Sequence, residues 1–282
     1  MRAEFDSHFI LSLMTEMVHR NRMMRRFILS FFFMLVLAFP CAASEKIVLA
    51  SSEWPPYAGE SLVGNGASAM IVREAFRAVD IELEIRFYPW NRLLHEMAND
   101  PTIQGYFPEY TGREDLYNYS DSIGKSPIGF AKRVSGATTW NSYDDLKKYR
   151  IGVVSGYINT KRFDEMVTAG EIRINTTGFD RFNLRKVLLG RVEMAVVDMN
   201  VFRYFVRTDP LLYPNRTDIE MDAHLMDIIN LYVCFAKTEK GDRLQSLFNK
   251  GLRKVHVRRM QNNYVDELVK SLGQAVPVKK FQ

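Results

Sequence analysis

Polar and aromatic side chains come at or just after the ends of several predicted strands of this 282-residue chain. Arg113 offers a planar guanidinium, which can hold a carboxylate through two parallel hydrogen bonds. Asp198 directly follows an apolar segment, and a carboxylate in that place can pair with a cationic group. In an open α/β sheet, ligands bind beyond the carboxyl ends of the strands. The pattern therefore indicates that these side chains converge on one cleft.

Both residues also have a structural interpretation that the sequence leaves open. Arg113 can be a surface arginine that pairs with Glu114 or Asp115. Asp198 can be the N-cap of a helix over residues 199–206, a position that aspartate favours. The cap and a ligand role are compatible for Asp198.

Two further groups of residues stand at strand ends. Trp54 and Tyr57 follow the first predicted strand, and aromatic faces attract cations and cover apolar stems. The alternative, favoured for Trp54, is packing in the core. Ser155, Gly156 and Tyr157 precede a predicted helix, so their backbone amides can meet an anion. The alternative for this second group is an ordinary turn.

Strand-like and helix-like segments alternate along the chain and must position these side chains. The alternation predicts an α/β fold with a mostly parallel sheet flanked by helices. Start signals for helices are Ser68, a capping box of Ser142 with Asp145, and Asp180, whose helix Gly190 closes. The predicted strands span residues 46–51, 83–87, 102–107, 127–132, 150–154, 171–174, 193–197 and 228–236.

The N-terminal segment has the composition of an export signal. Two arginines precede an apolar run over residues 27–39, and small residues follow it. This order is typical of a secretory signal peptide, and the run is shorter than the roughly 20 residues that span a bilayer. We expect a cleaved leader over residues 1–44, with Met23 or Met24 as an alternative start, and a periplasmic mature chain. The alternative is a buried helix or an uncleaved anchor.

The composition is that of an ordinary globular protein and excludes a disordered or low-complexity chain. Lys and Arg number 38 against 33 Asp and Glu, which gives a formal charge of +5. Two of these net charges belong to residues 1–44, and the remainder gives no argument for a nucleic-acid partner. Only Cys234 remains after the leader, so an internal disulfide is excluded.

The residues give little support to an enzyme. His95, His224 and His256 are scattered and lack the spacing of a metal site. The chain has no Gly-x-Ser-x-Gly elbow and no phosphate-binding loop. Cys234 lies in an apolar strand, which favours an inert thiol in the core. We therefore expect no catalytic residues, no metal and no cofactor.

Several short motifs stand in the order known from one protein family. They are Trp54-Pro55-Pro56-Tyr57, Gly66, Trp90, Thr111 with Arg113, Tyr119-Ser120-Asp121, Ile151-Gly152-Val153 with Ser155-Gly156, and the stretch from Gly190 to Asp198. On these motifs the chain resembles family 3 of the extracytoplasmic (periplasmic) solute-binding proteins, which serve ABC transporters for polar amino acids. The resemblance covers residues 46 to about 269, nearly all of the mature chain.

The resemblance implies two lobes joined by crossing strands, with a small polar, amino-acid-like ligand between them. Lobe 1 would hold residues 45–131 plus 234–282, and lobe 2 residues 132–233. The protein would be a monomer that closes about its hinge and delivers the ligand to an ABC permease. The alternative is a ligand-sensing subunit of the same fold that signals to a membrane kinase or chemoreceptor. A secreted hydrolase is less favoured.

The resemblance also assigns roles to residues. Arg113 matches the arginine that grips the ligand's α-carboxylate, although a single residue separates it from Thr111 where the family has two. Asp198 matches the aspartate that binds the ligand's ammonium. Trp54 and Tyr57 stand where the family packs aromatic rings on the ligand.

Four more residues would surround the same site and favour an unusual ligand. Tyr106 and Glu109 occupy a loop where the family uses small residues. The carboxylate of Glu109 could select a cationic ligand or replace a group of the ligand. Trp90 and Arg92 would line the mouth, unless they are only a helix start with a solvated arginine.

Overall fold

The computed structural model of the chain describes residues 24–25 and 44–274. The leader expected over residues 1–44 therefore lies almost wholly outside the described residues. The described residues from Ser44 onward belong to one compact unit. Among the helices of the described residues, none is both long enough and apolar enough to cross a membrane.

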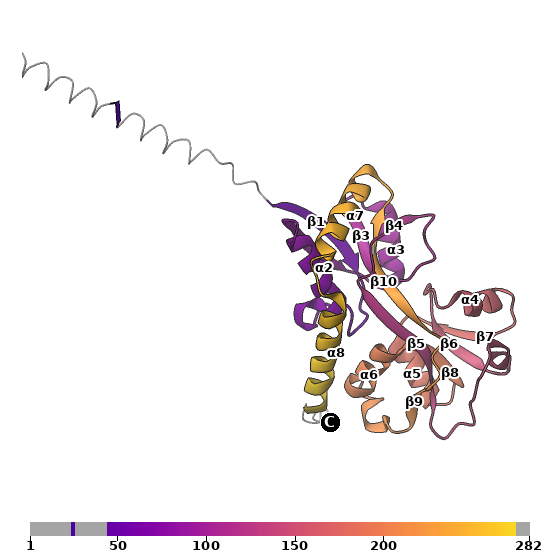
Figure 1. Ribbon diagram of the computed structural model, residues 1–282. Helices are drawn as coiled ribbons and strands as arrows, with labels where there is room; N and C mark the ends of the chain where they lie inside the picture. The colour runs from indigo at the N-terminus through magenta and orange to yellow at the C-terminus, as the bar shows by residue number, and fades with distance from the viewer. Residues whose placement is uncertain (1–23, 26–43, 275–282) are drawn as a thin grey trace, which may run out of the picture. The chain divides into compact units, whose positions relative to one another are not determined.

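Within the described residues, ten strands form one mixed sheet in the order β2-β1-β3-β10-β5-β8-β6-β7, with β4 beside β10 and β9 beside β5 (Figure 1). The strands are β1 (Glu45–Ser51), β2 (Ile81–Phe87), β3 (Ile103–Glu109), β4 (Tyr117–Tyr119), β5 (Gly124–Arg133), β6 (Arg150–Val154), β7 (Arg173–Thr177), β8 (Met194–Asp198), β9 (Ile219–Met221) and β10 (Asp227–Ala236). The helices are α2 (Ala67–Arg77), α3 (Trp90–Asn99), α4 (Lys161–Thr168), α5 (Asp180–Leu188), α6 (Met199–Thr208), α7 (Glu239–Leu252) and α8 (Val257–Gln274). The described residues also form three short 3-10 helices, namely η1 (Val63–Asn65), η2 (Tyr143–Lys148) and η3 (Tyr213–Asn215).

The sheet has two halves, each with its own helices, which we call the first and the second lobe. In the first lobe, β1 pairs in parallel with β2 and β3, and α2, α3 and α7 pack on these strands and on β10. In the second lobe, β6 pairs in parallel with β7 and β8, and α5 and α6 pack there. This arrangement is the mixed, mostly parallel α/β architecture that the sequence predicts.

Two long strands, β5 and β10, join the lobes (Figure 1). They pair with each other in antiparallel fashion over residues 124–128 and 227–231. Beyond this pairing, β5 continues beside β8 of the second lobe, while β10 continues beside β3 and β4 of the first. The expected lobe boundaries, between residues 131 and 132 and between residues 233 and 234, fall within these two strands. The lobe bounds drawn from them stay a prediction.

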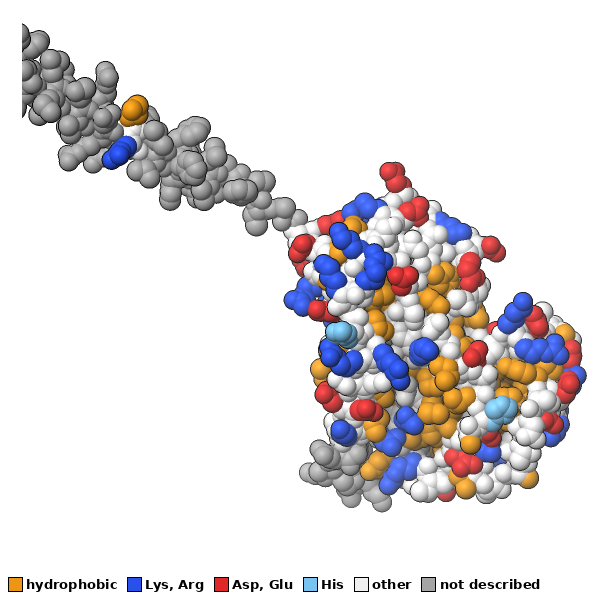
Figure 2. All heavy atoms as spheres, viewed as in Figure 1, with side chains coloured by type: hydrophobic (Ala, Val, Ile, Leu, Met, Phe, Trp, Pro, Cys, Tyr) orange, Lys and Arg blue, Asp and Glu red, His pale blue; other side chains and the backbone are white. Residues whose placement is uncertain are grey.

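Apolar side chains fill the space between the sheet and its helices. Every residue of β8 is buried, as an inner strand covered on both faces requires. In the first lobe, Phe76 of α2 meets Phe248 of α7 with ring centroids 5.0 Å apart. Charged side chains of both signs are interspersed over the face of the molecule in Figure 2. The core therefore supplies the stability, since Cys234 is a free buried cysteine.

Most predicted elements are confirmed within a few residues, but some details are wrong. Gly66 is the N-cap of α2, and Ser68 lies buried in the first turn instead of capping it. Asp180 is the first residue of α5, whose N-cap is Phe179. The capping box of Ser142 is confirmed, although it starts the 3-10 helix η2. Strands β4 and β9 were not predicted, because three residues are too few to show an alternating pattern.

Candidate functional site

Side chains from the ends of four strands meet between the lobes. Trp54 and Tyr57 lie in the turn after β1, and Glu109 ends β3 of the same lobe. Tyr157 follows β6, and Asp198 ends β8 of the second lobe. The sheet topology thus brings residues that are far apart in the sequence to one cleft, as the strand-end pattern predicts.

Asp198 links the two lobes through its carboxylate. Its Oδ1 accepts the backbone N–H groups of Asn200 (2.6 Å) and Val201 (2.9 Å), which confirms that it caps α6. Its Oδ2 accepts the hydroxyls of Tyr57 in the first lobe (2.8 Å) and Ser126 in β5 (2.6 Å). The predicted role of Asp198 toward a ligand ammonium stays a prediction.

Burial determines the protonation states of Asp198 and Tyr57. Asp198 is 2% exposed, and the loss of water raises the pKa of its carboxyl to about 6, against hydrogen bonds that lower it. Burial and the charge of Asp198 raise the pKa of Tyr57 well above its ordinary value. The Tyr57 hydroxyl therefore keeps its proton, which it can donate to Asp198, and it accepts the side-chain amide of Asn200 at 2.9 Å.

Arg113 pairs with a carboxylate of its own lobe. Its Nε donates to Oε2 of Glu109 at 3.0 Å, and its Nη2 donates to the backbone oxygen of Gly156 in the second lobe at 2.9 Å. The hydroxyl of Tyr106 (3.0 Å) and the backbone N–H of Tyr110 (2.8 Å) donate to the same carboxylate. Glu109 is thus held by three donors while it is 5% exposed.

The surroundings of Arg113 differ from the surface alternative considered for it. Among the described residues its side chain forms no ion pair with Glu114 or Asp115, and Glu114 instead accepts the backbone N–H of Gly112. Burial raises the pKa of Glu109, and the nearby Arg113 guanidinium acts against this rise. The role of Arg113 toward a ligand carboxylate stays a prediction.

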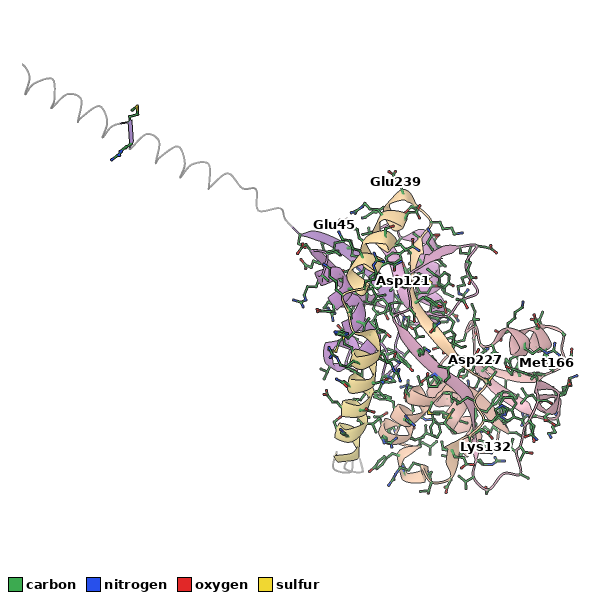
Figure 3. The ribbon with its side chains drawn as sticks, in the orientation of Figure 1. Glu45, Asp121, Lys132, Met166, Asp227 and Glu239 are labelled. Atoms are coloured by element: carbon green, nitrogen blue, oxygen red, sulfur yellow. The ribbon has the colours of Figure 1, made fainter. Side chains whose placement is uncertain are left out.

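A small cavity of about 30 Å³ lies between the lobes, and four of its nine lining residues are aromatic. Its lining residues are Ser52, Trp54, Trp90, Pro108, Glu109, Tyr110, Tyr157, Ile158 and Leu231. A larger hollow of about 850 Å³ shares Tyr110 and Ile158 with it and extends along the 110–114 loop and α4. Asp227, labelled at the start of β10 in Figure 3, lines this outer hollow.

The aromatic residues predicted for the site have distinct places. Trp54 stacks on Tyr57, with ring centroids 4.6 Å apart. Of these two residues, Trp54 lines the cavity and Tyr57 does not. Trp90 meets the ring of Tyr157 edge-on at 5.5 Å and donates its indole N–H to the Gly156 oxygen at 3.1 Å. Trp90 and Tyr157 therefore close one side of the cavity across the lobe boundary.

Six predicted residues do not line the cavity: Tyr57, Tyr106, Arg113 and Asp198, described above, and also Arg92 and Ser155. Arg92 is on the exposed side of α3, where it pairs with Glu96 at 3.2 Å. Ser155 is exposed, and its backbone N–H donates to Thr177 at 2.8 Å. The N–H of Tyr157 is likewise taken within its turn. The carbonyl of this turn, and not its amides, faces Arg113.

Asp180 is a buried carboxylate at the cleft that sequence reasoning treated only as a helix start. It is 5% exposed, and burial together with the neighbouring charge of Asp198 raises its pKa to about 7. The indole of Trp54 and the hydroxyl of Tyr157 lie close enough to lower this pKa in part. A single aspartate before a helix is too common a signal to mark a site.

Comparison with solved structures defines the fold. A histidine kinase sensor domain similar to periplasmic binding proteins matches with a TM-score of 0.65 and 15% identity, over 81% of this chain and 96% of that one. The amino-acid ABC transporter substrate-binding protein AbpA from Streptococcus pneumoniae, bound to L-arginine, matches with a TM-score of 0.63 and 14% identity, over 80% of this chain and 95% of that one. The GluR0 ligand-binding core from Nostoc punctiforme, in complex with L-glutamate, matches with a TM-score of 0.60 and 14% identity, over 80% of this chain and 98% of that one.

The chain therefore has the two-lobed, periplasmic-binding-protein-like fold. No family model matches the chain, and no curated protein matches its sequence. Among the described residues, no group of three or more His, Cys, Asp and Glu side chains could hold a metal ion.

Proposed function

We propose that the chain is an extracytoplasmic solute-binding protein, of the family 3 type, that captures a small polar, amino-acid-like ligand between its lobes. The observation that carries this proposal is the aromatic cavity between the lobes, with buried charged groups around it. Ligand sites are concave and mostly apolar, with a few placed polar groups. The cleft has this composition, and it lies where the strands of both lobes end.

Binding would act through closure of the lobes. The two strands β5 and β10 are the connection between them, which suits a hinge. The cavity of about 30 Å³ is far below the several hundred Å³ typical of ligand sites, so a ligand enters only when the lobes separate or side chains move. A ligand that contacts both lobes would then favour the closed state by its differential affinity.

Delivery of the ligand to an ABC permease is the role we propose first. Sensing is the second candidate, and the similarity to a histidine kinase sensor domain favours it. Both roles require the same binding step, and they differ in the partner protein that recognises the closed state. A permease gene next to this one would support delivery, and a histidine kinase gene would support sensing.

The binding step is tested by isothermal titration calorimetry of the exported, signal-cleaved protein against the twenty amino acids and their amines. Native mass spectrometry of the freshly purified protein identifies any ligand that stays bound. We expect at least one saturable one-to-one interaction and recovery of the ligand unchanged. Absence of binding by every compound, with no co-purified ligand, would refute the proposal, while chemical conversion of a ligand would indicate an enzyme.

A further inference from the structure

Arg113, the predicted partner of a ligand carboxylate, already donates hydrogen bonds to two groups of the protein. The Nε of Arg113 donates to Glu109, and its Nη2 donates to Gly156 across the cleft. Glu109 lines the cavity, whereas Arg113 is absent from its lining. A ligand carboxylate that reached Arg113 would have to displace a buried carboxylate that three donors hold, and such a displacement leaves a buried charge unpaired.

The walls of the cavity suit a cation. Trp54, Trp90, Tyr110 and Tyr157 all line it, from both lobes. Aromatic faces attract ammonium groups within about 6 Å of the ring, and rings that surround such a group strengthen the effect. The cavity of about 30 Å³ is large enough to hold a group the size of a water molecule, and a primary ammonium is of similar size.

A second carboxylate, that of Asp180, lies behind these rings and is not neutralised by an ion pair among the described residues. Asp180 lies by Trp54 and Tyr157, which both line the cavity. The indole N–H of Trp54 is buried and, in the described part of the chain, has no hydrogen-bond partner, so it stops short of bonding the Asp180 carboxylate. Among the described residues no side chain forms an ion pair with Asp180, unlike Glu109.

The lining of the outer hollow is also mainly negative in charge. Its lining includes the carboxylates of Glu114, Asp164, Glu165 and Asp227 against the single ammonium of Lys161. Charges of one sign along a cleft raise the local concentration of ligands of the other sign. The approach to the cavity therefore favours a cationic ligand and disfavours an anionic one.

We propose that the cleft binds a primary amine without requiring a carboxylate on it, and that Glu109 takes the place of the ligand carboxylate on Arg113. The ammonium occupies the cavity among the four aromatic rings and faces Glu109, while Asp180 supplies a second negative charge from behind Trp54 and Tyr157. The rest of the ligand extends into the outer hollow. This inference rests on the proposed function, because it names the ligand class of the same site.

The direct test compares ligands that differ by one carboxylate. The pairs are cadaverine with lysine, putrescine with ornithine, agmatine with arginine, and tyramine with tyrosine, each titrated calorimetrically at pH 8. We expect the amine to bind at least tenfold more tightly than its amino acid in at least one pair. Binding of amino acids in preference to every amine would overturn the inference and leave the proposed function intact. Failure of both classes, with no co-purified ligand, would overturn both.

Substitutions test the assigned residues. Glu109→Gln releases Arg113, so we expect the amino acid of the best pair to gain at least tenfold in affinity relative to its amine. Asp180→Asn should weaken amine binding at least tenfold, with an unchanged circular dichroism spectrum. Asp115→Asn, which removes an exposed carboxylate from the Arg113 loop, is the matched control. An equal response of Glu109→Gln and the control would contradict the place given to Glu109.

Discussion

The carboxylate of Asp180 destabilises the folded protein at neutral and higher pH. Its pKa is about 7 in the folded state, against an ordinary value of 3.8. The folded state thus binds this proton more tightly, so the free energy of unfolding rises as the pH falls through 7, and the gain is complete below about pH 4. The groups that face it are Asp198, Trp54, Tyr157 and Tyr110, and none is a cation.

Asp180→Asn should therefore stabilise the protein in a pH-dependent way. The amide has nearly the same shape and no charge to desolvate. We expect the melting temperature at pH 8 to rise by several degrees, at about 2–4 °C per kcal/mol for a chain of this size, and to change far less at pH 4.5. Differential scanning calorimetry at both pH values measures this, with Asp115→Asn as the exposed control. A lower melting temperature at pH 8 would show that Asp180 supports the fold.

The sequence predicted some residues of the site because their neighbours in the chain carry the signal. Asp198 follows an apolar strand directly, and both its cap role and its place at the cleft can be inferred from that position. Glu109 and Arg113 could be placed on one loop, but their pairing depends on side-chain directions that spacing does not give. Asp180 could not be found, because its burial and its place beside Trp54, which lies 126 positions away in the sequence, arise only in the folded chain.

At the scale of elements, the turn between β1 and α2 fixes the position of Tyr57. Gly66 caps α2 with a φ of +102°, a conformation that residues with a side chain rarely adopt. A Cβ placed on Gly66 would lie 2.5 Å from the backbone oxygen of Tyr57. That same oxygen accepts the N–H of Ser68 at 2.8 Å, which ties the turn to the helix.

Gly66→Ala should thus damage both the helix start and the site. We expect a loss of about 1–3 kcal/mol in the free energy of unfolding, since both the backbone conformation and the close contact are unfavourable for alanine. Urea denaturation measures the loss. Gly178→Ala is the matched control, because a Cβ there meets no atom within 4 Å and its φ is not positive. Equal stability of the two variants would contradict the assigned role of Gly66.

Long, periodic elements were predictable and short ones were not. The strands β1, β6 and β8 show their apolar runs in the sequence and are found nearly where expected. Strands β4 and β9 exist because β10 and β5 offer free edges, which is a property of the folded sheet. The helix signal of Ser68 was misleading, because Gly66 starts α2 two residues earlier through its backbone alone.

For the whole molecule, the lobes are held together by direct contacts across the cleft. Tyr57 of the first lobe bonds Asp198 and Asn200 of the second, and Trp90 and Arg113 both donate to the Gly156 oxygen. In the part of the chain that the structure describes, the pairing of β5 with β10 joins the sheets of the lobes, and α6 of the second lobe also contacts α8. The side-chain hydrogen bonds across the cleft, each worth about 0.5–3 kcal/mol, therefore contribute to the balance between open and closed states.

Tyr57→Phe should shift this balance toward the open state. The phenyl ring keeps the stacking on Trp54, while the hydroxyl that bridges Asp198 and Asn200 is lost. We expect small-angle X-ray scattering to give a larger radius of gyration for the ligand-free variant than for the wild type, and a larger contraction when a saturating ligand is added. Tyr143→Phe is the control, because its hydroxyl bonds Thr160 within the second lobe at 2.8 Å. If both variants match the wild type, or if they change alike, hydrogen bonds across the cleft do not set the closure, and the ligand must supply all of the free energy that brings the lobes together.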